Sequence, residues 1–124
     1  MPKEVTQITL TLPFPPSVNR LWKTKKNGGM YRSAEYKAWR QHALWAIQSR
    51  TKGDHIKGPY KLEIMAVRPD KRRRDIGNLE KAVSDILQAA NVIEDDCLCE
   101  DQHLRWVAAG PECSVIVTSI NMSN

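Results

Sequence analysis

Alternation of apolar and polar residues, or enrichment in β-branched residues, predicts four strands along the chain. The first is the clearest, because Ile8 and Leu10 fall on one face while Thr9 and Thr11 fall on the other. Pro13 ends it, since proline cannot donate a hydrogen bond to a neighbouring strand. The four predicted strands cover residues 6–12, 60–66, 104–108 and 114–120.

A repeat of about 3.6 residues predicts two helices. The first follows Ser33, a favoured N-cap residue, and is expected to end near Gly53. The second has a continuous apolar stripe, and Asn91 follows it as a C-terminal stop. Its stripe consists of Leu79, Val83, Ile86, Leu87 and Ala90. Residues 17–31 are expected to form a loop or an irregular hairpin, and residues 94–101 an acidic loop.

The predicted order of elements is strand, helix, strand, helix, strand, strand. This order predicts an α+β fold in which two helices pack on one mixed sheet. With 124 residues and 41% hydrophobic side chains, the chain is long enough for one modest core. We therefore expect a single domain spanning residues 1–124.

Charge is distributed unevenly along the chain, which carries a formal net charge of +5. One cationic run is formed by residues 71–74, and a second by Lys23, Lys25 and Lys26, whereas acidic residues gather at 94–101. A basic surface beside an acidic cluster suits a phosphate backbone next to a cation site. The alternative for the run at 71–74 is a solvated turn, in which the four cations face water.

Three cysteines without repeated spacing do not resemble a disulfide framework or a zinc site. The first ten residues lack the apolar core of a signal peptide. No apolar run approaches the roughly 20 residues of a membrane span. We therefore expect a cytoplasmic protein with no membrane association.

Asp75 directly precedes the second helical pattern and has two interpretations. It is either an N-cap or, with Asp95 and Asp96, a ligand of Mg²⁺ (or of Mn²⁺), because hard cations take carboxylate oxygens. A helix of this length separates its ends by about 20–25 Å. The loop after the helix must therefore double back if these carboxylates are to share one site.

Asn78, Lys81 and Asp85 share one stripe of the second helix. Lys81 is either a group that stabilises negative charge on a phosphoryl oxygen or an exposed lysine paired with Asp85. The four tryptophans are expected in the core, except Trp22, which lies among cations and is a candidate for base stacking.

Taken together, these features resemble the RusA family of Holliday junction resolvases. The resemblance lies in the opening Leu12-Pro-Phe-Pro-Pro-Ser-Val-Asn19-Arg20, in the basic run into Arg74-Asp75-Ile-Gly-Asn78-Leu-Glu-Lys81, and in the later Asp95-Asp96 pair. It covers nearly the whole chain. It implies a homodimeric, divalent-metal endonuclease that nicks four-way junction DNA symmetrically, encoded by a bacterium or a phage.

The resemblance also implies roles for individual residues. Asp75, Lys81 and Asp96 would be catalytic, and Asp75, Asp95 and Asp96 would hold the metal. The residues that would bind DNA are Asn19, Arg20, Lys23, Lys25, Lys26, Lys71, Arg72, Arg73, Arg74 and Asn78.

Gly77 departs from the family pattern, which has a further catalytic aspartate at this position. Either Asp95, Glu80 or Asp101 compensates, or the protein binds junctions and cuts them poorly. The sequence thus supports two principal hypotheses, a junction-resolving nuclease and a branched-DNA-binding module that does not cut. A third, an adaptor whose basic patch binds an acidic protein, accounts for the charge but not for the spaced carboxylates.

Overall fold

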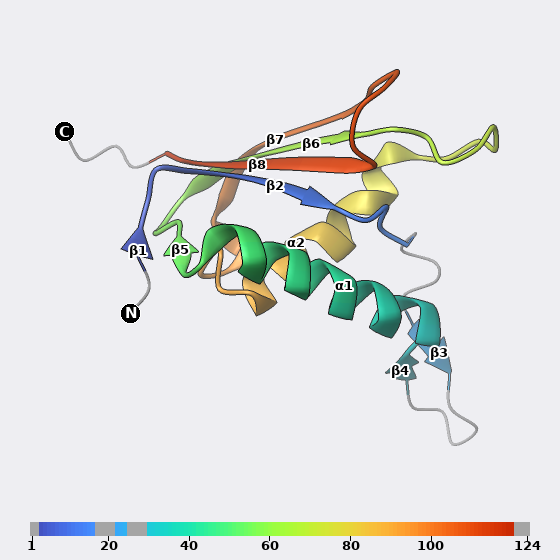
Figure 1. The fold of residues 1–124 in the computed structure, drawn as a ribbon, viewed down its shortest axis with the longest axis horizontal. Helices are drawn as coiled ribbons and strands as arrows, with labels where there is room; N and C mark the ends of the chain where they lie inside the picture. The colour runs from blue at the N-terminus through green and yellow to red at the C-terminus, as the bar shows by residue number, and fades with distance from the viewer. Residues whose placement is uncertain (1–2, 17–21, 25–29, 121–124) are drawn as a thin grey trace.

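The computed structural model describes residues 3–16, 22–24 and 30–120. Its centre is a four-stranded sheet with the strand order β2-β8-β6-β7. The strands are β2 (Gln7–Leu12), β6 (Tyr60–Ala66), β7 (Cys99–Trp106) and β8 (Cys113–Ser119). Both long helices, α1 (Ala34–Thr51) and α2 (Glu80–Ala89), lie on the same side of this sheet (Figure 1). The α+β class predicted from the sequence is confirmed.

The sheet is mixed, as predicted. β8 is antiparallel to both β2 and β6, whereas β6 and β7 run parallel. Parallel neighbours need a crossover connection, and here α2 lies within the connection between β6 and β7. This crossover places the candidate chemistry of α2 beside the sheet.

Two small pairings lie outside the main sheet. β1 (Lys3–Glu4) runs parallel to β5 (Asp54–His55). β3 (Trp22–Thr24) and β4 (Met30–Arg32) form an antiparallel pair, so the hairpin interpretation of this region holds.

The core lies between the inner face of the sheet and the two helices. Alternate residues of β2, β6 and β8 are buried, as their sequence periodicity predicted. α1 contributes Tyr36, Trp39, Ala43 and Ile47 to the same core. Trp45, in contrast, is 72% exposed on α1, so its expected place in the core is wrong. It lies on the helix face opposite the buried stripe.

Capping explains where the helices begin and end. The Ser33 hydroxyl accepts a hydrogen bond from the Tyr36 amide at 3.1 Å, which confirms the predicted N-cap. α2 is preceded by a 3₁₀ turn, η2 (Ile76–Leu79). Asn91 has a φ of 61°, the left-handed conformation that ends helices, so the predicted stop is confirmed.

The segment between α2 and β7 differs from the sequence prediction. A short 3₁₀ turn, η3 (Asp96–Leu98), occupies its middle. β7 begins at Cys99, five residues before the expected Leu104. The last three residues of the predicted acidic loop, 99–101, therefore belong to this strand. The alternation is weak here because β7 is an edge strand and most of its side chains are exposed.

None of the helices in the described ranges is long and apolar enough to cross a membrane.

Candidate active site

A groove of about 530 Å³ opens where the end of β2, the loop after β6 and η2 meet. Its lining includes Phe14, Pro15 and Pro16 from the exit of β2 together with Arg72, Arg73, Arg74, Asp75 and Asn78. The structure therefore brings the Pro-rich exit and the basic run, which are far apart in the sequence, to one place. Lys71 is exposed and does not line the groove.

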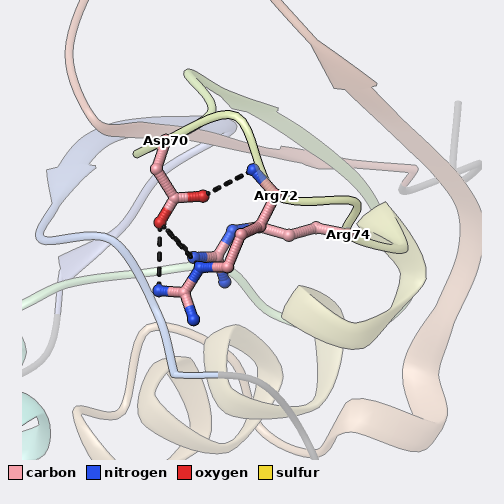
Figure 2. Close-up of polar contacts among 3 residues, drawn as sticks. All are labelled: Asp70, Arg72 and Arg74. Atoms are coloured by element: carbon pink, nitrogen blue, oxygen red, sulfur yellow. Dashed lines mark hydrogen bonds and ion pairs between the residues drawn. The ribbon is translucent and has the colours of Figure 1, made fainter.

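Asp70 organises the basic run. Its Oδ1 accepts a hydrogen bond from the Arg72 amide at 3.0 Å, and its Oδ2 accepts from the guanidinium groups of Arg72 and Arg74 at 3.1 and 2.9 Å (Figure 2). These bonds, led by the Arg72 amide, lower the pKa of Asp70 to about 2. Two of the four cations are thus paired within the protein and held in a defined geometry.

Arg74 is also held by an aromatic platform. Its guanidinium lies 5.6 Å from the ring centre of Phe14, and Phe14 stacks on Trp106 of β7 at 6.2 Å. Arg68 covers the Trp106 ring at 4.8 Å. Trp106 is therefore half-buried in a stack of rings and cations at the rim of the groove.

Asp75 is an N-cap, as one of its two interpretations proposed. Its Oδ1 accepts a hydrogen bond from the Gly77 amide at 3.0 Å at the start of η2. The cap uses one carboxylate oxygen, and Asp75 is exposed where it lines the groove. Because the cap engages only Oδ1, capping does not exclude a ligand role, and the two interpretations are compatible.

Lys81 is paired with Asp85, at 3.2 Å between Nζ and Oδ1. The Tyr36 hydroxyl donates a hydrogen bond to the other Asp85 oxygen at 3.3 Å, which links this pair to α1. The hydrogen bond with Asp85 raises the pKa of Lys81, and the nearby negative charges of Asp96 and Glu80 raise it further. Lys81 is thus a firmly cationic group beside several carboxylates.

The loop after α2 is tied to the helix by a side-chain contact. The Asp96 amide donates a hydrogen bond to the Gln88 side chain at 3.1 Å, which ties η3 to α2. Asp96 is then close enough for its charge to act on Lys81, in the first turn of α2. Asp95 caps η3 by accepting a hydrogen bond from the Cys97 amide at 2.9 Å, and this bond lowers the pKa of Asp95.

The candidate residues fall into two adjoining groups. Asp75, Asn78 and the arginines line the groove, whereas Lys81, Asp85 and Asp96 lie along α2 next to it. Within the described ranges, no three His, Cys, Asp or Glu side chains already form a metal-binding cluster.

The cysteines at 97, 99 and 113 are free thiols. The predicted DNA-binding positions Asn19, Arg20, Lys25 and Lys26, and the side chain of Lys23, lie outside the described residues.

Sequence reasoning missed several residues that build this site. Phe14 and Trp106 support Arg74, Tyr36 holds Asp85, and Asp70 holds the arginines. Only Asp70 carried a local signal, because an aspartate two residues before an arginine often accepts that residue's backbone amide. The aromatic contacts depend on tertiary packing and leave no such signal.

Comparison with known proteins places this chain in a family. The model of the family described as endodeoxyribonuclease RusA matches residues 13–118. The chain belongs to the RusA family. A crossover junction endodeoxyribonuclease RusA from Aquifex aeolicus is 31% identical over 115 residues, 92% of this chain and 90% of that protein.

RusA proteins of the same description from Escherichia coli strain K12 and from Enterobacteria phage 82 are each 37% identical over 93 and 92 residues. These matches cover 75% and 74% of this chain, and 77% and 76% of the respective relatives. The RusA match begins at the exit of β2 and extends through β8, so it includes the whole groove and the α2 stripe.

Proposed function

We propose that this protein is an endodeoxyribonuclease that resolves four-way DNA junctions by paired, metal-dependent nicks. The observation that carries the proposal is the convergence of the Pro-rich exit of β2, the basic run and Asp75 in one groove. The relatives named above are crossover junction endodeoxyribonucleases, which is the activity that such a groove suits.

The arginines of the groove supply the phosphate contacts. Guanidinium groups bind phosphate through paired hydrogen bonds, and Arg72, Arg73 and Arg74 all line the groove. Asn78 also lines the groove, and its uncharged amide can donate a hydrogen bond to a phosphate or sugar oxygen. Such contacts position the DNA backbone without reading its sequence.

The donor set in and beside the groove fits a hard divalent cation such as Mg²⁺. Asp75, Asp95 and Asp96 offer carboxylate oxygens, and one or two protein carboxylates suffice when water and phosphate complete the shell. When bound, the cation would polarise the scissile phosphate and lower the pKa of an attacking water.

Lys81 supplies positive charge to the same region. Its ammonium group remains protonated because Asp85 accepts a hydrogen bond from it. A fixed cation stabilises the charge that builds on phosphoryl oxygens during cleavage. Tyr36 and Asp85 act as positioning residues, since they orient Lys81 without facing the DNA groove.

Paired cutting requires two equivalent sites, and a two-fold homodimer supplies them. We propose that the protein is a homodimer and that β2 with its Pro-rich exit contributes to the contact. The binding module without cleavage remains the second candidate, because Gly77 occupies the position of a family aspartate.

The test is cleavage of a labelled four-way junction in Mg²⁺ or Mn²⁺ by the parent protein and by Asp75→Asn. Asparagine preserves the N-cap but removes the charge. We expect cleavage to fall at least about 100-fold while junction binding persists. Asp54→Asn, in β5 and outside the groove lining, removes the same charge as the matched control and should cut normally. Cleavage by Asp75→Asn at the parent rate would refute the proposed site, and binding without cleavage by the parent would favour the second candidate.

A further inference from the structure

Trp39, in the second turn of α1, is bonded to the exit of β2. Its indole nitrogen Nε1 donates a hydrogen bond to the Pro13 carbonyl at 2.9 Å. The Trp39 side chain is part of the core between the sheet and the helices, and the residue is only 7% exposed. Pro13 directly follows β2, so this bond ties the beginning of the Pro-rich exit to α1.

The chain after Pro13 is stiff, so the position of its carbonyl determines where the next residues lie. Proline rings fix φ at positions 13, 15 and 16, and Phe14, which precedes Pro15, is confined to extended conformations. Phe14 lines the groove, and its ring lies 5.6 Å from the Arg74 guanidinium. The hydrogen bond from Trp39 therefore helps to hold Phe14 and Arg74 in the groove.

The same indole contacts the residues that hold Lys81. It stacks on the ring of Tyr36, with 6.2 Å between ring centres and planes 20° apart. The Tyr36 hydroxyl donates a hydrogen bond to Asp85 Oδ2 at 3.3 Å, and Asp85 Oδ1 lies 3.2 Å from Lys81 Nζ. Tyr36 is 1% exposed, and close packing leaves its ring no room to move independently of the indole.

Packing alone does not require an indole at position 39. A phenylalanine ring also fills apolar space, whereas a buried indole N–H group needs an acceptor. The acceptor here is a carbonyl at the exit of β2 rather than a group of α1 itself. Trp39 is thus bonded to the Pro-rich exit on one side and packed against Tyr36 on the other.

We propose that Trp39 is a positioning residue for DNA cleavage, which holds the Pro-rich exit of β2 and Lys81 in one fixed relative placement. The inference rests on the proposed function, in which Arg74 binds the DNA backbone and Lys81 stabilises charge on the phosphoryl group. Small displacements between a bound substrate and a catalytic group cost much of the rate. Trp39 is not among the described residues that line the groove, so it acts through Pro13 and Tyr36.

The first experiment replaces Trp39 by phenylalanine, which keeps an aromatic ring but lacks the N–H group. In single-turnover cleavage of a labelled four-way junction with Mg²⁺, we expect the rate to fall at least about ten-fold. Junction affinity should change by less than about two-fold, because Phe14 and the arginines are kept. Trp45→Phe makes the same chemical change at an exposed position of α1 and should cut at the parent rate. Cleavage by Trp39→Phe at the parent rate would overturn the inference.

A double variant separates positioning from a general loss of packing. Tyr36→Phe keeps the ring that stacks on Trp39 and removes only the hydroxyl that bonds to Asp85. If both residues place Lys81 through one chain of contacts, the combined variant should cut about as slowly as the slower single variant. Two independent losses of packing would instead multiply, and that result would overturn the inference.

A measurement without DNA keeps this test separate from the nuclease proposal. In NMR spectra of the DNA-free protein, Trp39→Phe should shift the side-chain signals of Asp85 and Lys81, whereas Trp45→Phe should leave them in place. Unshifted Lys81 signals would overturn the inference. So would a parent in which the indole hydrogen of Trp39 exchanges with solvent as fast as that of Trp45.

The two proposals fail in different ways. If the signals of Lys81 shift in Trp39→Phe but the parent cuts no junction, the nuclease proposal fails, while the placement of Lys81 by Trp39 stands. If the parent cuts junctions and Trp39→Phe cuts equally fast, only the inference about Trp39 fails.

Discussion

The ring of Phe14 stacks on the indole of Trp106, with 6.2 Å between ring centres and planes within 9° of parallel. This contact joins the exit of β2 to the end of β7, the two edge strands of the sheet. Because Arg74 lies over Phe14 and Arg68 over Trp106, the stack also holds two cations, of which Arg74 lines the groove.

The first prediction concerns this stack. Phe14→Leu keeps an apolar side chain but removes the ring, and we expect it to lower the free energy of unfolding by about 1 kcal/mol. Junction affinity should fall as well, because Arg74 loses its support. Urea unfolding and band-shift assays measure the two effects. Trp45→Leu, which alters an exposed aromatic, is the control and should change stability by less than about 0.5 kcal/mol.

Asp70 gives a prediction about pH. Its pKa of about 2 lies below the ordinary 3.8, so the carboxylate stabilises the loop fully above about pH 4. That contribution should be lost as the pH falls from 4 towards 2. A carbon-detected titration of the Asp70 carboxyl group should give this low value. When Arg72→Ala and Arg74→Ala are combined, the pKa should rise part of the way towards 3.8, because the backbone amide at position 72 is kept, and an unchanged value would show that the side-chain pairing is absent in solution.

Removing Asp70 should also change DNA binding. Asp70→Asn frees Arg72 and Arg74 from their internal partner, so we expect tighter binding to duplex DNA and a steeper salt dependence. Fluorescence anisotropy at several salt concentrations measures the slope. Asp54→Asn, remote from the groove lining, removes the same charge and controls for the change in net charge.

The combined change Arg72→Ala and Arg73→Ala should weaken junction binding. Each lost phosphate contact should flatten the dependence of log affinity on log salt by about one unit. Arg50→Ala, in the last turn of α1, is the comparison and should leave the slope as it is. If the slope stays the same in the double variant, these arginines face solvent in the complex.

The last prediction is the assembly state. Sedimentation at micromolar concentration should show a homodimer, because paired nicks need two sites related by symmetry. A monomer both with and without junction DNA would contradict the dimer and the paired mechanism together.

The sequence predicted those elements whose periodicity is strong. β2, β6 and β8 each bury one face against the helices, and this burial imposes alternation on their residues. β7 is an edge strand with mostly exposed side chains, so Cys99–Asp101 show no alternation of apolar and polar residues from which a strand could be predicted. The strand order also escaped prediction, because it depends on contacts between distant segments.

The candidate site was predictable residue by residue but not in its assembly. Asp75 and Lys81 were each given two interpretations, and in both cases the structural partner, Gly77 or Asp85, is present. The sequence could not show that Asp96 contacts α2, because this contact is a hydrogen bond from the Asp96 amide to the Gln88 side chain, which leaves no pattern in the sequence.

The strand order has a consequence for the synthesis of the protein. β8 is the last of the four strands to emerge from the ribosome, yet it lies inside the sheet, between β2 and β6. Until β8 is made, β2 cannot join β6, and the Pro-rich exit cannot meet the basic run. A nascent chain therefore carries no assembled groove until β8 has been translated.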